Sequence, residues 1–186
     1  DAIEVITGGL KRLGLDYDEG PVFQSDRLET YRRYAQELME KGLAYKSDHG
    51  AADKGEAVVL QRPMEAISWV DLLRDRITFE PEDMKELVII KSDGYPTYNF
   101  ACAVDDHEMN ITKVLRGDDH ISNTPKQLMV YEALDWKPPE FGHFPMILGP
   151  DGARLSKRHG AVKVTDFLDA GYFPHTVINY IALLGW

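Results

Sequence analysis

The chain has 186 residues, of which 44% are hydrophobic and 28% charged, and its formal net charge is −10 at pH 7. This length and composition are those of an ordinary globular domain with a core of its own. The acidic balance argues against a general nucleic-acid binder, because neutralisation of phosphates dominates that affinity, although a local basic surface stays possible. The single cysteine, Cys102, excludes a disulfide framework and a zinc site built on several thiolates, and it fits a reducing cytoplasm. No apolar run is long enough to span a membrane.

The first half of the chain predicts two helices and then short strands. Apolar residues at helical spacing favour a helix over 2–13. A second helix is expected to be capped by Ser25 or Asp26 and to end at Gly42. The polar residues 46–56 predict a loop. Strands are then expected at 57–60, 77–79 and 87–90.

The second half alternates strands and helices, which predicts an open α/β sheet. The expected elements are a helix over 98–109, a strand over 111–116, a helix over 124–134 capped by Thr124, a strand over 143–148, and helices near 165–170 and 174–184. Ligands of such sheets bind at the carboxyl ends of the strands. Arg116 and residues 154–160 both lie at such ends.

Residues 154–160 read Arg-Leu-Ser-Lys-Arg-His-Gly, so three cations and a histidine share one short loop. Ammonium and guanidinium groups form strong charge-assisted hydrogen bonds to phosphate oxygens. Lys157 is therefore a candidate phosphate ligand, and Arg158 could bind a second anion or nucleic acid. Ser156 and the loop amides could add donors. The alternative is a solvated basic turn, the commonest fate of a charge run.

Three further side chains could contact a polar ligand. Arg116 ends an apolar strand, where its planar guanidinium suits a carboxylate or phosphate. An ion pair with Asp118 or Asp119 is equally consistent with the sequence. Tyr98 could orient a substrate through its hydroxyl or simply pack as an aromatic residue. His120 could donate to a substrate or cap its own turn.

Two similar tripeptides, Asp105-Asp106-His107 and Asp118-Asp119-His120, raise the possibility of a metal site. Carboxylates and imidazoles could together bind one or two divalent ions, as in phosphoester hydrolases. Adjacent acids on one element point in different directions, however. We therefore favour a helix end and a helix start that both suit aspartate, and we expect no protein-bound metal.

Taken in order along almost the whole chain, these segments resemble the glutamyl-tRNA synthetases, a family of class I aminoacyl-tRNA synthetases. Any one segment alone is a weak signal, whereas the ordered series is specific. The segments that carry the resemblance are Leu-Gly-Leu-Asp-Tyr-Asp-Glu-Gly-Pro at 13–21, Ser-Asp-Gly-Tyr-Pro-Thr-Tyr-Asn-Phe-Ala at 92–101, Leu-Arg-Gly-Asp-Asp-His at 115–120, and Leu-Ser-Lys-Arg-His-Gly-Ala-Val at 155–162. The last of these is similar to the family's KMSKS loop.

The resemblance implies ATP-dependent activation of L-glutamate and its transfer to tRNA(Glu), with Mg²⁺ carried by ATP. It implies catalytic roles in the basic loop for Ser156, Lys157 and Arg158. It implies contacts to ATP by Leu155, Lys157 and His120. It implies contacts to glutamate by Tyr98, Cys102, Arg116 and Asp119.

The resemblance also implies a Rossmann-like α/β catalytic domain, present in part, with a short inserted α+β subregion. The expected parts are catalytic domain over 1–45, a reduced acceptor-binding insertion over 46–90, the second half of the catalytic domain over 91–164, and the start of a stem-contact helical region over 165–186. The family's HIGH motif and anticodon-binding domain are not in this sequence, so we expect the fragment alone to be inactive. Because the insertion lacks cysteine ligands, we expect no zinc.

Two related alternatives stay open at this point. One is a paralogue that glutamylates a modified tRNA base, and the other is a non-catalytic tRNA-binding module. In each case we expect a cytoplasmic monomer without membrane contact. A metal-dependent hydrolase built on the two Asp-Asp-His stretches is the remaining alternative from another class.

Overall fold

The computed structural model describes residues 2–48, 55–149, 151–152 and 163–185. The chain divides into a central unit, Phe23–Phe144, and a terminal unit, which joins Asp1–Val22 to Pro145–Trp186. None of the helices in the described ranges is long and apolar enough to cross a membrane.

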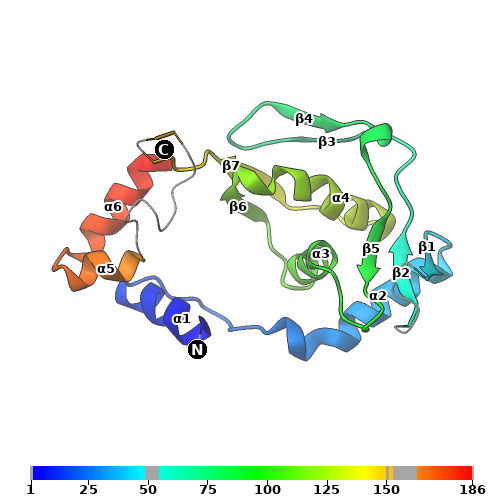
Figure 1. The fold of residues 1–186 in the computed structure, drawn as a ribbon, viewed down its shortest axis with the longest axis horizontal. Coiled ribbons are helices and arrows are strands. Elements are labelled where there is room, and N and C mark those ends of the chain that lie inside the picture. Colours follow the sequence, from blue (N-terminus) through cyan, green and yellow to red (C-terminus); the bar gives the residue numbers. More distant parts are fainter. Residues whose placement is uncertain (1, 49–54, 150, 153–162, 186) are drawn as a thin grey trace. The chain divides into compact units, whose positions relative to one another are not determined.

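The central unit holds three α-helices, three 3₁₀ turns and seven short strands among its described residues (Figure 1). The helical elements are η1 (Gln24–Arg27), α2 (Leu28–Glu40), η2 (Pro81–Asp83), α3 (Tyr98–Glu108), η3 (Asp118–Asn123) and α4 (Thr124–Ala133). The strands are β1 (Ala44–Ser47), β2 (Ala57–Leu60), β3 (Ile67–Val70), β4 (Arg76–Phe79), β5 (Leu87–Ile90), β6 (Lys113–Gly117) and β7 (Glu140–Phe144). Strands β1, β2 and β5 form an antiparallel sheet, β3 and β4 a hairpin, and β6 and β7 a parallel pair.

Helix α2 shows how the sequence sets the packing of this unit. Tyr31, Ala35 and Leu38 recur at helical spacing and are all buried. The helix stops at Gly42, whose φ of 72° lies in the left-handed region that favours glycine. There the N–H of Leu43 donates to the carbonyl of Leu38 at 3.0 Å, which satisfies a carbonyl at the helix end.

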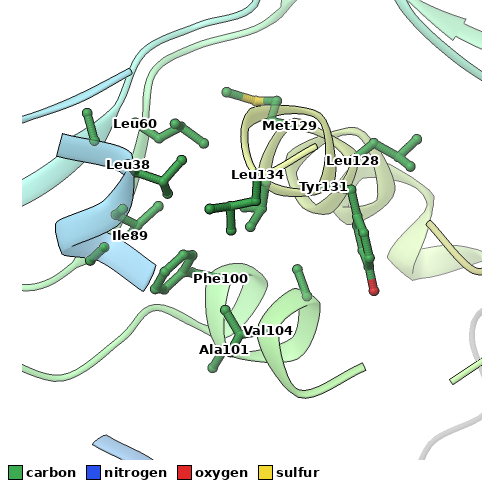
Figure 2. Close-up of a cluster of buried hydrophobic side chains, with 14 of the residues drawn as sticks. Leu38, Leu60, Ile89, Phe100, Ala101, Val104, Leu128, Met129, Tyr131 and Leu134 are labelled. Atoms are coloured by element: carbon green, nitrogen blue, oxygen red, sulfur yellow. The ribbon is translucent and has the colours of Figure 1, made fainter. Parts of the chain in front are cut away.

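The core lies between α2, α3, α4 and the antiparallel sheet. Figure 2 shows α3 and α4 facing each other with Phe100, Val104 and Leu134 between them. Leu38 of α2 and Ile89 of β5 approach from the side of the sheet. All five of these side chains are at most 4% exposed. Each contributes about 1.5–3 kcal/mol of burial free energy relative to an exposed position.

The parallel pair β6–β7 places Arg116 directly opposite His143. The outer edge of β7 is occupied by the segment that follows β3, because the N–H of Leu72 donates to the carbonyl of Phe141 at 2.8 Å. This segment comes very close to Gly142. A Cβ added at Gly142 would lie 2.8 Å from a δ-carbon of Leu115 and 3.2 Å from Cβ of Leu72.

The terminal unit consists of α1 (Ala2–Arg12), α5 (Val164–Asp169) and α6 (Pro174–Gly185). Arg12 bonds to Asp169 at 2.7 Å, which links α1 to α5. The terminal unit leaves large apolar side chains exposed, among them Phe173, Tyr180 and Leu183.

Most of the predicted elements are present, and the errors have local causes. The strand expected over 143–148 is β7, which ends at Phe144 because Pro145 has no N–H for a ladder. Strand β3 was not predicted, and β1 begins before the loop expected over 46–56.

The predicted helix caps are wrong. Helix α2 begins only after η1, with Arg27 at its cap position and no side-chain capping bond. Helix α4 has Asn123 at its cap position, and Thr124 belongs to the first turn. The hydroxyl of Thr124 contacts Arg116 instead, so a tertiary contact replaces the local one.

Candidate functional site

Arg116 stands near the carboxyl end of β6, where α/β sheets place their ligands. Its Nε donates to Nε2 of His143 at 3.2 Å, and its Nη2 donates to Oγ1 of Thr124 at 2.8 Å. The guanidinium also lies over the ring of Phe141, 5.4 Å from the ring centre. These three partners carry no carboxylate, so they orient the guanidinium without cancelling its charge.

Tyr98 opens α3 beside this arginine. The turn before it is set by Gly94, whose φ is 83°, and by Thr97, whose hydroxyl donates to the carbonyl of Val88 at 2.7 Å. Tyr98 shares a side-chain hydrogen bond with Cys102, one helical turn further on, and burial together with Cys102 raises the pKa of its phenol. Burial also raises the pKa of the Cys102 thiol, so Cys102 is a poor nucleophile here.

His120 comes from η3, directly after β6. Its ring centre lies 6.2 Å from that of Tyr98, and its Nδ1 lies 3.0 Å from Nδ2 of Asn123. Asp119 stands next to it and is exposed. Asp118 pairs with Arg74 at 2.8 Å and not with Arg116, which was one of the ion pairs that the sequence left open.

The electrostatics of the site agree with this geometry. Burial lowers the pKa of the Arg116 guanidinium, and the nearby Tyr98, Cys102 and Asp106 oppose that shift. Arg116 therefore remains a cation in a partly dehydrated setting, where its attraction to an anion is stronger than in bulk water. The structure thus brings Arg116, Tyr98, Cys102 and His120 together, with Asp119 on the adjoining turn.

The predicted residues of the basic loop lie outside the described part of the chain. They are Leu155, Ser156, Lys157 and Arg158. Their roles stay predictions.

The two Asp-Asp-His stretches do not assemble a metal centre within the described ranges, which hold no group of three or more suitable side chains. Asp105 is buried against α2 and its preceding turn, where it accepts hydrogen bonds from Gln24, Arg27 and Tyr31. Asp106 is close enough to Arg116 to affect its pKa, and it also lines a separate feature.

That feature is an open cavity of about 590 Å³ lined by Asp106, Tyr131, Lys137 and neighbouring residues. Burial raises the pKa of Asp106 to about 6. The hydroxyl of Tyr131 is buried and has no hydrogen-bond partner among the described residues. The cavity lies at the amino ends of β6 and β7, whereas Arg116 lies towards their carboxyl ends. We therefore place the candidate site at Arg116.

Three residues at the site were not predicted from the sequence in this role. His143, Asp71 and Thr124 surround the inner side of Arg116. A histidine two positions after an apolar residue, as in Phe141-Gly142-His143, is a weak signal of a buried imidazole on the same strand face. No local signal connects Asp71 to it.

Comparison with known proteins decides the family. The model of the family described as "tRNA synthetases class I (E and Q), catalytic domain" matches residues 1–53 and 47–186. The chain belongs to this family. The match confirms the family resemblance drawn from the sequence and the class I synthetase fold.

Named relatives of this synthetase chain are glutamate–tRNA ligases. Glutamate–tRNA ligase 2 of Fervidobacterium nodosum is 46% identical over 207 residues, covering 98% of this chain and 44% of the relative. The glutamate–tRNA ligase of Thermodesulfovibrio yellowstonii is 44% identical over 214 residues, covering 99% of this chain and 46% of the relative. The chain therefore spans a little under half the length of these relatives.

Solved structures agree. A glutamate tRNA ligase from Elizabethkingia meningosepticum, in complex with its amino acid, matches with a TM-score of 0.88 and 25% identity, covering 100% of this chain and 51% of that one. The glutamate–tRNA synthetase of Elizabethkingia anophelis matches with a TM-score of 0.86, also at 25% identity, over 100% of this chain and 52% of that one.

Proposed function

We propose that this chain forms part of the catalytic domain of a glutamate–tRNA ligase, which activates L-glutamate with ATP and transfers the glutamyl group to tRNA(Glu). The observation that carries the proposal is Arg116, a half-buried guanidinium held at a strand end beside Tyr98 and His120. The names of the relatives and the bound amino acid in a solved neighbour support it.

Arg116 supplies the selectivity for an acidic amino acid. A guanidinium binds a carboxylate through two parallel hydrogen bonds, which fixes its direction as well as its charge. We assign Tyr98 and Asp119 to the rest of glutamate, and His120 to a contact with the nucleotide. Cys102 can add only a weak contact, because its thiol is a weak hydrogen-bond donor.

The chemistry requires two displacements. A carboxylate oxygen of glutamate attacks the α-phosphorus of ATP, and the bond to pyrophosphate breaks. A hydroxyl of the terminal adenosine of tRNA then attacks the activated carbonyl carbon, and AMP leaves. We assign Lys157, with Ser156 and Arg158, to the negative charge that develops on the phosphates, and Leu155 to a contact with ATP. Such charge stabilisation has to grow towards the transition state to accelerate the reaction. Mg²⁺ arrives with ATP, because phosphates and water provide most of its ligands.

We further propose that residues 46–90 form a shortened acceptor-binding insertion without zinc, between catalytic parts at 1–45 and 91–164 and a stem-contact region at 165–186. Two findings support this. The alignment with the Fervidobacterium relative extends over 207 positions, more than the 186 residues of the chain, so the relative carries residues that this chain lacks. The family model also matches in two pieces that meet near residue 50. We propose a cytoplasmic, monomeric enzyme. The single cysteine of this chain fits a reducing compartment.

The test is ATP–pyrophosphate exchange by the full gene product, with tRNA present, comparing glutamate with glutamine and aspartate. We expect exchange that depends on glutamate, and we expect Lys157→Ala to lower its rate about 100- to 1,000-fold, by analogy with the loss of an oxyanion donor. Lys137→Ala is the matched control, because Lys137 is an exposed lysine at the amino ends of the strands. Wild-type protein without glutamate-dependent exchange would exclude the function. Analysis of the acceptor also separates charging of the terminal adenosine from modification of an internal base.

A further inference from the structure

A buried series of hydrogen bonds runs from Asp71 through His143 to Arg116. Oδ2 of Asp71 lies 2.6 Å from Nδ1 of His143, and Nε2 of His143 lies 3.2 Å from Nε of Arg116. The side chains of Asp71 and His143 are both 0% exposed. Asp71 follows β3 and His143 belongs to β7, so a hairpin and the parallel pair both contribute to this series.

The partners fix the proton on His143. Nε of an arginine always carries a hydrogen, so Nε2 of His143 has to accept. Nδ1 then carries the only ring proton and donates it to Asp71. An imidazolium, or the other neutral tautomer, would place one N–H against the N–H of Arg116. Arg116 therefore donates to the imidazole, and the imidazole donates to the carboxylate of Asp71.

Asp71 is held so that it remains an anion. Burial alone would raise the pKa of its carboxyl, but hydrogen bonds from His143, from the N–H of Leu73 and from the indole of Trp69 outweigh burial and lower the pKa. The N–H of His143 also donates to Oδ1, at 3.1 Å. A fixed anion at Nδ1 in turn keeps the imidazole in the tautomer that Arg116 needs.

Thr124 completes the arrangement. Its Oγ1 accepts from Nη2 of Arg116 at 2.8 Å and lies 3.1 Å from Nε2 of His143. The edge of the guanidinium formed by Nε and Nη2 is thus directed inward. A carboxylate that binds Arg116 through two hydrogen bonds has to approach the other edge, formed by Nη1 and Nη2.

We propose that Asp71 and His143 are positioning residues for the amino-acid pocket: they hold Arg116 so that its outer edge meets the carboxylate of the substrate. The inference rests on the proposed function, because it takes glutamate as the ligand of Arg116. Neither residue touches the substrate. Both act through the direction and rigidity that they impose on the guanidinium, which is where the affinity for a planar carboxylate originates.

Two substitutions at His143 separate its two bonds. Gln places an amide oxygen near the position of Nε2, so His143→Gln keeps the acceptor for Arg116. Asn reaches only the position of Nδ1, so His143→Asn keeps the contact with Asp71 and loses that acceptor. We expect His143→Asn to raise the KM for glutamate about 10- to 100-fold in pyrophosphate exchange by the full gene product, with the KM for ATP unchanged. We expect His143→Gln, which keeps that acceptor but loses the bond with Asp71, to raise the KM for glutamate by less, about 3- to 10-fold.

Leu38→Ala is the control for lost stability, because Leu38 is buried in the same unit and is remote from these bonds in the chain. It should lower the midpoint of thermal unfolding and leave both KM values unchanged. Equal KM values for glutamate in His143→Asn and wild type would overturn the inference, as would equal effects of the Asn and Gln variants or a parallel rise in the KM for ATP.

A second measurement does not depend on the activity, and it needs one folded variant only to assign the resonance of His143. In protein labelled with nitrogen-15 histidine, the resonance that is lost in His143→Gln should report a proton on Nδ1 and a bare Nε2 at neutral pH. An imidazolium or the opposite tautomer would overturn the positioning role. Failure of wild-type exchange, in contrast, would exclude the proposed function and leave the tautomer result intact.

Discussion

Two buried carboxylates in the central unit, those of Asp105 and Asp71, both accept several hydrogen bonds but have different roles. Asp105 on α3 accepts hydrogen bonds from three residues at the start of α2 and in the turn before it, so its bonds end inside the scaffold. Asp71 accepts hydrogen bonds from the same number of residues, but one of them, His143, also bonds to Arg116 at the candidate site. Both carboxylates are buried, so burial does not distinguish a stabilising carboxylate from a functional one. What distinguishes them is whether the residues that they bond lie within the scaffold or lead to the candidate site.

The largest effect on activity is expected at Arg116, the last residue of the hydrogen-bonded series that starts at Asp71. Arg116→Lys keeps the positive charge but loses the planar fork and the Nε donor to His143. We expect kcat/KM for glutamate to fall about 100- to 1,000-fold, with little change in thermal unfolding. Steady-state exchange kinetics with the full gene product measure this. An unchanged kcat/KM would show that Arg116 does not bind the substrate.

Asp105→Asn tests the other carboxylate. Arg27, whose side chain is 22% exposed, would lose the counter-charge that lies 2.8 Å away. We expect the free energy of unfolding to fall by about 2–4 kcal/mol, because an unpaired charge would be left in a partly buried place. Urea titration measures the loss. The KM for glutamate should not change, and a tenfold rise in KM without a loss of stability would contradict the distinction between the two carboxylates.

Asp106 is a third carboxylate of the central unit, and its substitution should change stability in a way that depends on pH. We expect this to be the smallest of the three effects. Burial raises the pKa of Asp106 from an ordinary 3.8 to about 6. Between these values the folded protein binds more protons at this site than the unfolded chain, so the contribution of Asp106 to stability falls as the pH rises through the window. We expect Asp106→Asn to gain stability relative to wild type from about pH 4 to about pH 6 and to keep that gain above it. The measurement is the free energy of unfolding of both proteins at several pH values. A difference between them that stays constant from pH 4 to pH 6 would contradict the raised pKa of Asp106.

The sequence predicts the helices of this fold better than its short strands. The face of α2 formed by Tyr31, Ala35 and Leu38 is visible as a period in the chain. Strands of four residues, such as β1 and β3, carry too little pattern to be recognised without their partners. The end of β7 at Phe144 depends on Pro145, which the hydrophobic pattern alone does not weigh.

The candidate site divides in the same way. Arg116 could be predicted because a charge at the end of an apolar strand is a local signal, and His120 because it follows directly. His143 and Asp71 could not, because 72 residues separate them and only the fold brings them together. Thr124 was expected to cap its helix, since nothing in the local sequence reveals that Arg116 competes for its hydroxyl.

Gly142 sets how far the hairpin stands from the parallel pair. A methyl group there would meet Leu115 and also Leu72, whose Cβ would be only 3.2 Å from the methyl carbon, and it would push the segment after β3 outward. The carboxylate of an aspartate extends only one methylene from its backbone, so a hairpin held farther out would need a glutamate to span the same gap. Among related enzymes, a side chain at this glycine position should therefore accompany a longer acid at the position of Asp71. A hairpin transplanted without its matching strand would hold its aspartate too far from the histidine to bond to it.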